Sequence, residues 1–204
     1  MKAFAINGSP RQGGNTETLL NKVLDQLRLD GWETEYMQIG GKPVRGCLAC
    51  MKCNEKKNGR CIIEGDFVNT CLQKMYEADA IILGSPTYFG DVSTEMKALI
   101  DRAGFVSLAN GGKLSGKIGA AVVAVRRGGA THVFNTINNL FFLSSMVIPA
   151  SLYWNFGVAC EKDQVLGDAE GILNMEHLGK AISWLGKAIE PVKDTYPRHE
   201  VELK

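Results

Sequence analysis

Four cysteines lie close together in the sequence, at Cys47, Cys50, Cys53 and Cys61. The first three form a C-x2-C-x2-C run, which bacterial ferredoxins use to bind the irons of a cluster. The spacing therefore predicts a [4Fe-4S] cluster held by these four thiols. Zinc sites more often use two separated C-x2-C pairs, and a thioredoxin-like pair would use only Cys50 and Cys53. A zinc site and a cluster-free loop of reactive thiols remain the alternatives.

A second set of chemical groups lies in residues 7–16, which read NGSPRQGGNT. This loop offers backbone N–H groups, the hydroxyls of Ser9 and Thr16, the amide of Asn15 and the guanidinium of Arg11. A helical pattern begins directly after it, so the positive end of a helix dipole adds to the attraction for an anion. We therefore predict a phosphate-binding loop, with an ordinary glycine-rich turn as the alternative. The spacing matches neither GxGxxG nor GxxxxGK[ST], which disfavours a dinucleotide fold and a P-loop NTPase.

Two further glycine-bearing loops follow apolar runs, at residues 84–91 and 126–129. Loops that follow parallel strands meet at one edge of the sheet, where doubly wound folds bind their ligands. One loop for a phosphate and two for a planar ring describe a mononucleotide flavin site. From the third loop we expect Arg126, Gly128 and Gly129 to contribute to it.

The elements that must position these loops are short apolar runs that alternate with helical patterns. The predicted strands are residues 2–6, 34–39, 80–83, 118–125 and 151–157. This alternation predicts an α/β fold with a parallel, doubly wound sheet. Residues 40–65 show no clean periodicity and are expected to form a long cysteine-rich loop after the second strand. We expect one domain over residues 1–193 and an exposed tail over residues 194–204.

The helix boundaries rest on capping residues. Asp66 is expected to cap a helix that runs to about Tyr76. Ser93 or Thr94 is expected to cap the next helix, and Asp168 is expected to cap the last one.

These motifs resemble the NADPH-dependent FMN reductase family. The resemblance is carried by Gly8 to Arg11 with Gly14 to Thr16, by Gly84 to Gly90, and by Met96-Lys97 through Asp101-Arg102. The cysteine segment, residues 40–65, narrows this resemblance to the iron–sulfur flavoprotein branch. The resemblance implies a flavodoxin-like sheet in the order 2-1-3-4-5. It also implies an FMN phosphate held by Ser9, Arg11, Asn15 and Thr16, with Pro86, Thr87, Tyr88, Phe89 and Gly90 along the ring.

The resulting expectation is an FMN-dependent oxidoreductase in which the flavin carries the chemistry, so no side chain is named as catalytic. With a cluster, the protein would relay single electrons between the [4Fe-4S] group and FMN, with a ferredoxin-like carrier as partner. Without one, it would be an NAD(P)H-dependent reductase of quinones, flavin or oxygen species. A zinc-binding or thiol redox-sensing interaction module is the third alternative. The phosphate loop argues against it, because a scaffold needs no such loop.

Composition and charge limit the kinds of partner that we expect. The formal net charge of +1 gives no electrostatic footprint for nucleic acid or an anionic membrane. No apolar run reaches membrane-spanning length, and the first strand begins at once, so we expect a cytoplasmic protein. A flavin at the open edge of a small domain is poorly shielded, and residues 139–143 offer apolar surface. We therefore expect a homodimer or homotetramer.

The remaining cysteines and histidines are expected to play no part in the chemistry. Cys71 and Cys160 are predicted to be buried apolar thiols. His132 is predicted to lie on the surface at the start of a helix, and His177 and His199 are not expected to be ligands.

Overall fold

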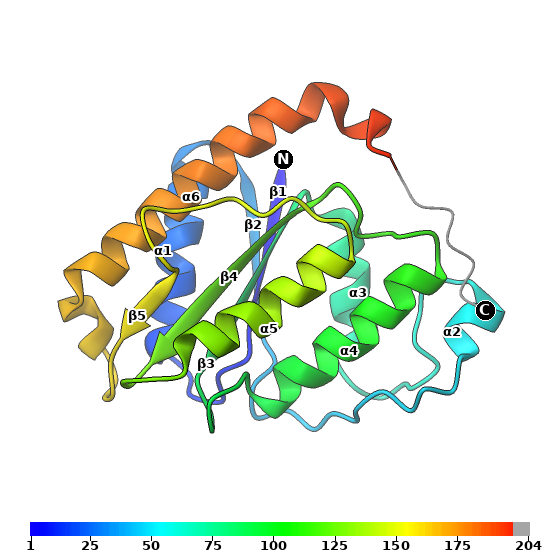
Figure 1. Ribbon diagram of the computed structural model, residues 1–204, viewed down its shortest axis with the longest axis horizontal. Helices are drawn as coiled ribbons and strands as arrows, with labels where there is room; N and C mark the ends of the chain where they lie inside the picture. Colours follow the sequence, from blue (N-terminus) through cyan, green and yellow to red (C-terminus); the bar gives the residue numbers. More distant parts are fainter. Residues whose placement is uncertain (198–204) are drawn as a thin grey trace.

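The computed structural model describes residues 1–197 of the chain and consists of one sheet with helices on both faces (Figure 1). Its elements, in chain order, are β1 (Lys2–Asn7), α1 (Asn15–Leu29), β2 (Glu33–Gln38), α2 (Lys52–Lys56), α3 (Val68–Glu77), β3 (Ala80–Pro86), α4 (Thr94–Ala109), β4 (Ile118–Val125), α5 (Ala130–Leu143), β5 (Phe156–Val158), the 3-10 helix η1 (Gln164–Gly167), α6 (Ala169–Ile189) and the 3-10 helix η2 (Glu190–Thr195).

The sheet has five parallel strands in the order β2-β1-β3-β4-β5, which confirms the predicted fold class and strand order. The strand order reverses between β1 and β3, which lie side by side with Asn7 opposite Gly84. Because every strand runs in the same direction, the loops that follow β1, β3, β4 and β5 all emerge at one edge. That edge is where doubly wound sheets bind their ligands.

Alternate residues of each central strand enter two separate cores. In β1, Phe4 and Ile6 face the core under α3, α4 and α5, whereas Ala3 and Ala5 face the core under α1 and α6. Both faces of β3 and β4 are buried in the same alternating way. Burial on both faces explains why these strands are continuous apolar runs in the sequence.

The predicted caps are found at two helices, and one strand is shorter than predicted. The Ser93 hydroxyl accepts a hydrogen bond from the Met96 N–H at 3.3 Å, and Asp168 accepts one from the Gly171 N–H at 3.0 Å. The fifth strand covers only Phe156–Val158, although residues 151–157 were predicted. The Ser151 hydroxyl donates to the Tyr153 carbonyl at 2.6 Å, so a local turn takes the place of the strand.

Residues 40–65 form the predicted irregular loop, which contains only the short helix α2. In Figure 1 α2 lies beside α4, far from the sheet edge at which β4 and β5 end. Ala49 and Met51 have φ angles of 48° and 56°, which are rare for residues other than glycine. Such strained conformations concentrate at functional sites.

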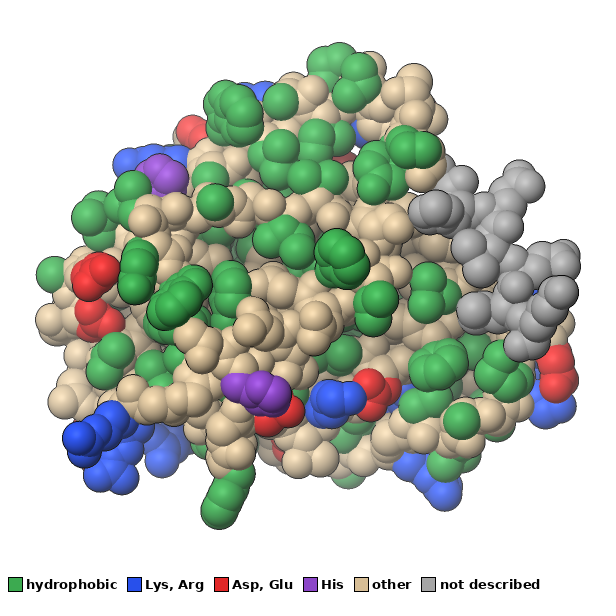
Figure 2. All heavy atoms as spheres, in the orientation of Figure 1, with side chains coloured by type: hydrophobic (Ala, Val, Ile, Leu, Met, Phe, Trp, Pro, Cys, Tyr) green, Lys and Arg blue, Asp and Glu red, His purple; other side chains and the backbone are tan. Residues whose placement is uncertain are grey.

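Large apolar side chains remain exposed on the face that Figure 2 shows. Large exposed apolar residues of α5 and of the segment before β5 include Phe142, Leu143, Leu152, Tyr153 and Trp154. Within residues 1–197, no helix has both the length and the apolar character that a membrane-spanning helix requires.

Candidate functional site: an edge cleft and a cysteine pocket

A cleft of about 240 Å³ opens at the carboxyl edge of the sheet. It brings together residues from all three predicted loops and from a fourth segment, which follows β5. The residues that line it are Ser9, Arg11, Asn15, Thr16, Pro86, Thr87, Tyr88, Ala124, Arg126, Ala159 and Cys160. Eight of these residues were predicted from the sequence. Four of the eight belong to the predicted phosphate-binding loop, which precedes the first helix.

The first end of the cleft is suited to an anion. Helix α1 begins after Gly14, which has no side chain to cap it, so N–H groups of its first turn are available, while the Glu17 carboxylate accepts from the Gly13 N–H at 2.8 Å. The exposed Arg11 guanidinium and the buried Ser9 and Thr16 lie around this terminus. A Cβ atom on Gly40 would lie 2.2 Å from the carbonyl carbon of Ser9, so only glycine allows the segment after β2 to run this close to the loop.

Two of the predicted phosphate ligands contact the segment after β5. Asn15 Nδ2 donates to the Glu161 carbonyl at 2.9 Å, and Asn15 Oδ1 accepts from the Val165 N–H at 3.4 Å. Arg11 Nη1 donates to the Cys160 carbonyl at 3.4 Å. This segment therefore forms one wall of the cleft, held in place by the phosphate loop.

The other end of the cleft contains an unpaired buried hydroxyl. Thr87 Oγ1 is buried and has no hydrogen-bond partner within the described part of the chain. A buried polar atom without a partner costs free energy, which is recovered if a bound molecule pairs with it. Gly129, at φ 89°, packs so closely that a Cβ atom on it would lie 3.1 Å from the Thr87 methyl and 3.2 Å from Gly90 Cα.

Four predicted ring-contacting residues are not among the cleft-lining side chains. Phe89 is fully exposed, at a φ of 48°. Gly90, Gly128 and Gly129 belong to the two loops that frame the cleft, and Gly129 packs behind Thr87. These four residues shape the loops in this structure, whereas Pro86, Thr87, Tyr88 and Arg126 line the cleft.

Sequence reasoning missed Ala124, Ala159 and Cys160. Cys160 was predicted to be a buried thiol, and this prediction is wrong because Cys160 is exposed. It follows β5 directly, and the rule that ligands lie beyond the strand carboxyl ends applies to this strand too. Cys71 is buried as predicted, and burial raises its thiol pKa to about 12.

Asp91 closes the β3–α4 loop beside the cleft. Its carboxylate accepts hydrogen bonds from the Thr136 hydroxyl at 2.8 Å and from the Val92 N–H at 2.8 Å, and it lies 3.5 Å from His132 Nε2. Burial acts to raise the pKa of Asp91, but these hydrogen bonds and His132 outweigh it, so the pKa is lowered. His132 is exposed, as predicted, and His199 lies outside the described residues.

All four clustered cysteines line a second, small pocket against α4. Its walls are otherwise mainly apolar, with Leu48, Met51, Ile62, Ile63, Phe105 and Val106 among the lining residues. Two sulfur atoms accept hydrogen bonds: Cys47 Sγ from the Ala49 N–H at 3.4 Å, and Cys61 Sγ from Arg102 Nε at 3.3 Å. Burial raises the pKa of the Cys53 thiol, and the neighbouring Cys61 and Cys47 raise it further.

Arg102, on α4, is the largest fully buried side chain that lines this pocket. Besides Cys61, it contacts the Arg45 carbonyl at 3.1 Å, the Ile63 carbonyl at 2.9 Å and the carboxylate of Asp66. Burial acts to lower the Arg102 pKa, but Asp66 and Cys61 outweigh it, so the pKa is raised. One arginine thus fastens both ends of the cysteine segment to α4.

Within residues 1–197, no three Cys, His, Asp or Glu side chains converge closely enough to hold a single metal ion. A zinc ion binds each thiolate at about 2.3 Å, so its ligands must surround one point. A [4Fe-4S] core takes one thiolate on each of its irons, so its thiolates stand further apart. The four thiols line one pocket and match the number of thiolates that a [4Fe-4S] group requires.

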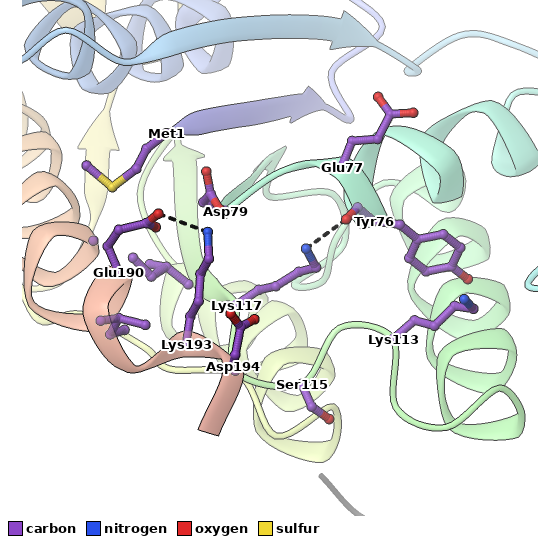
Figure 3. Close-up of a pocket in the computed structure, with 14 residues that line it drawn as sticks. Met1, Tyr76, Glu77, Asp79, Lys113, Ser115, Lys117, Glu190, Lys193 and Asp194 are labelled. Carbon is purple, nitrogen blue, oxygen red and sulfur yellow. Dashed lines mark hydrogen bonds and ion pairs between the residues drawn. The ribbon is translucent and has the colours of Figure 1, made fainter. Parts of the chain in front are cut away.

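A larger cavity, of about 380 Å³, lies at the opposite edge of the sheet, near Met1 (Figure 3). Two of its lysines are already paired. Lys117 Nζ donates to the Tyr76 carbonyl at 2.8 Å, and Lys193 pairs with Glu190 at 2.9 Å.

Comparisons with known proteins identify relatives along most of the chain. The profile of the NADPH-dependent FMN reductase family matches residues 1–159. An iron–sulfur flavoprotein from Methanocaldococcus jannaschii is 38% identical over 197 residues, which cover 93% of this chain and 100% of that protein. An iron–sulfur flavoprotein from Methanosarcina thermophila is 33% identical over 150 residues, which cover 72% of this chain and 76% of that protein.

The solved structures show the same fold. A flavodoxin, WrbA-like protein from Agrobacterium tumefaciens aligns with a TM-score of 0.64 and 14% identity, over 92% of this chain and 98% of that chain. At this identity the match establishes the flavodoxin-like fold.

Proposed function

The chain belongs to the NADPH-dependent FMN reductase family, in its iron–sulfur flavoprotein branch, and from this premise we propose that it relays electrons between FMN and a [4Fe-4S] cluster. Membership of the family makes it a flavin-dependent oxidoreductase. The proposal adds the second redox group, which Cys47, Cys50, Cys53 and Cys61 would hold. The observation that carries it is the pocket that these four thiols share.

The edge cleft fits FMN. The uncapped start of α1, Ser9, Thr16 and Arg11 would bind the phosphate, while Asn15 would hold the wall formed by the segment after β5. Pro86, Thr87, Tyr88 and Arg126 would hold the ring, and the unpaired Thr87 hydroxyl would find a partner there. When bound, FMN supplies hydride and single-electron chemistry, and the protein supplies position and electrostatics.

The cysteine pocket offers the four thiols that a cluster requires as ligands. Cys47 and Cys50 are exposed, whereas Cys53 and Cys61 are partly buried. The Ala49 N–H and Arg102 Nε already donate to two of the sulfur atoms. Hydrogen bonds to sulfur are part of the surroundings that tune iron–sulfur groups. When bound, a [4Fe-4S] cluster supplies one-electron transfer.

Helix α4 connects the two sites. It begins at Thr94, directly after the β3 loop, and carries Arg102 eight residues further on, about 12 Å along the helix axis. The start of the cysteine segment is also fastened to this helix, because the Gly41 N–H donates to Glu95 at 2.9 Å. We propose NAD(P)H or a ferredoxin-like carrier as electron donor and a quinone, flavin or oxygen species as acceptor.

The relay is tested by comparing two acceptors with anaerobically reconstituted protein. Wild type and Cys50→Ser are reduced with NAD(P)H, and the rates of quinone reduction and of reduction of a one-electron iron–sulfur carrier are measured. We expect Cys50→Ser to keep quinone reduction and to lose at least tenfold in carrier reduction. Cys71→Ser is the matched control, because Cys71 is buried outside the cysteine pocket, and should behave as wild type.

Equal carrier rates in wild type and Cys50→Ser would contradict the relay. The cluster-free NAD(P)H-dependent FMN or quinone reductase would then be the better description.

A further inference from the structure

The guanidinium of Arg102 is the only buried positive charge described among residues 1–197 that contacts a proposed cluster ligand. Its side chain is 0% exposed, and that of its partner Asp66 is 8% exposed. Arg102 Nε donates to Cys61 Sγ at 3.3 Å. The remaining guanidinium nitrogens are used by Asp66 and by two carbonyl groups of the cysteine segment.

A hydrogen bond to sulfur and a nearby charge both change a cluster's reduction potential. Reduction adds one negative charge to the cluster, so a fixed positive charge beside it stabilises the reduced form. Inside a protein the effective dielectric constant is lower than in water, so a buried charge acts more strongly than an exposed one. Arg102 supplies both effects through one side chain.

Asp66 opposes this effect. Its carboxylate contacts the same guanidinium and also accepts from the Val68 N–H at 3.1 Å, at the start of α3. A buried negative charge disfavours a more negative cluster. The pair therefore holds two opposite charges in a fixed relation to Cys61.

We propose that Arg102 is a positioning residue that sets the reduction potential of the cluster through Cys61, and that Asp66 limits this effect. The inference rests on the proposed function, because it requires the four cysteines to hold a cluster. It assigns a redox role to a residue that a purely structural account would treat as an anchor of the loop.

The test is a redox titration of the anaerobically reconstituted protein, followed by the cluster's visible absorption and electron paramagnetic resonance signal. Arg102→Gln removes the charge and is expected to lower the ratio of reduced to oxidised cluster at least tenfold at a fixed potential, or about 59 mV for one electron. Asp66→Asn removes the opposing charge while keeping an acceptor for Val68, and the ratio is expected to rise. Arg102→Lys keeps the charge without the Nε hydrogen bond and should fall between Arg102→Gln and wild type.

Shifts of the reduction potential in opposite directions in the two variants distinguish a redox role of Arg102 from a purely structural one. If Arg102 only held the loop, then Arg102→Gln and Asp66→Asn would both loosen it and shift the potential in the same direction or not at all, which would overturn the inference. Leu99→Ala, which opens a cavity under the same helix without touching the pocket, is the packing control and should leave the potential unchanged. If Arg102→Gln does not fold, the Asp66→Asn variant alone tests the inference: a rise in its ratio of reduced to oxidised cluster supports it, and no rise overturns it.

The proposed function and this inference fail in different ways. Wild type that takes up no iron and sulfide refutes the cluster itself. Wild type that takes up the cluster, with variants that share its potential, refutes only the role of Arg102.

Discussion

The side-chain amide of Asn15 joins the start of α1 to the carbonyl oxygen of Glu161, 146 residues away in the sequence, at 2.9 Å. Its oxygen accepts from the Val165 N–H on the same segment. Both ends of the amide thus hold one wall of the edge cleft. The family resemblance assigns Asn15 to the phosphate, but its contacts in this structure indicate that it shapes the site that receives the phosphate.

Asn15→Ala should weaken FMN binding by releasing this wall. Binding would then have to order the released wall again, which costs at most the worth of two neutral hydrogen bonds of about 0.5–1.5 kcal/mol each, so the Kd should rise by up to roughly 150-fold. The Kd for FMN is measured by the quenching of flavin fluorescence on binding. Glu161→Ala is the matched control, because Asn15 contacts the backbone of Glu161 and not its side chain. An Asn15→Ala variant with wild-type affinity would show that the wall does not depend on this amide.

The sheet could be predicted in detail because burial on both faces leaves a clear pattern. Ile118–Val125 is buried along its whole length, and its predicted boundaries are those observed. The fifth strand was predicted too long because residues 152–154 are apolar and aromatic but are exposed. The reason is a network that sequence pattern does not encode: Asn174 accepts from the Tyr153 N–H at 3.1 Å.

Thr87→Val should weaken FMN binding without lowering the stability of the protein that has no FMN bound. The Thr87 hydroxyl is buried without a partner, so replacing it by a methyl of similar size should leave thermal stability unchanged or raise it. If FMN provides the missing partner, its Kd should rise about 2- to 13-fold, for a hydrogen bond of about 0.5–1.5 kcal/mol. Unchanged FMN affinity would place the hydroxyl outside the binding site.

Asp91 should make the protein less stable in acid. Its folded-state pKa is lowered, so its contribution to stability is fully present above the unfolded-state pKa of about 3.9. That contribution is lost as the pH falls through the folded-state pKa. Urea midpoints should therefore show wild type more stable than Asp91→Asn near neutral pH, with the difference closing below about pH 4. A difference that stays constant with pH would mean that the charge of Asp91 does not stabilise the fold.

The exposed apolar residues of α5 and of the segment before β5 predict self-association. Light scattering at micromolar concentration is expected to give a dimer or tetramer, and Phe142→Asp to shift the protein toward monomer, because Phe142 is 76% exposed. Leu29→Asp is the control, as Leu29 is 79% exposed at the end of α1. A monomeric wild type would contradict this prediction.

The site was less predictable than the fold. The loops that follow β1, β3 and β4 could be found because glycine and polar residues interrupt apolar runs there. Cys160 was missed because the short strand before it gave no reliable end point. Nor did the sequence reveal that Arg102 contacts Cys61, because α4 brings together residues 41 positions apart.

The most direct test of the account is the content of iron, acid-labile sulfide and FMN after anaerobic reconstitution. For wild type we predict about four iron and four sulfide for each bound FMN. Cys50→Ser should retain FMN and lose most of the iron and sulfide. If wild type binds FMN but takes up no more iron and sulfide than Cys50→Ser, the cysteine pocket holds no cluster and the proposed relay is wrong.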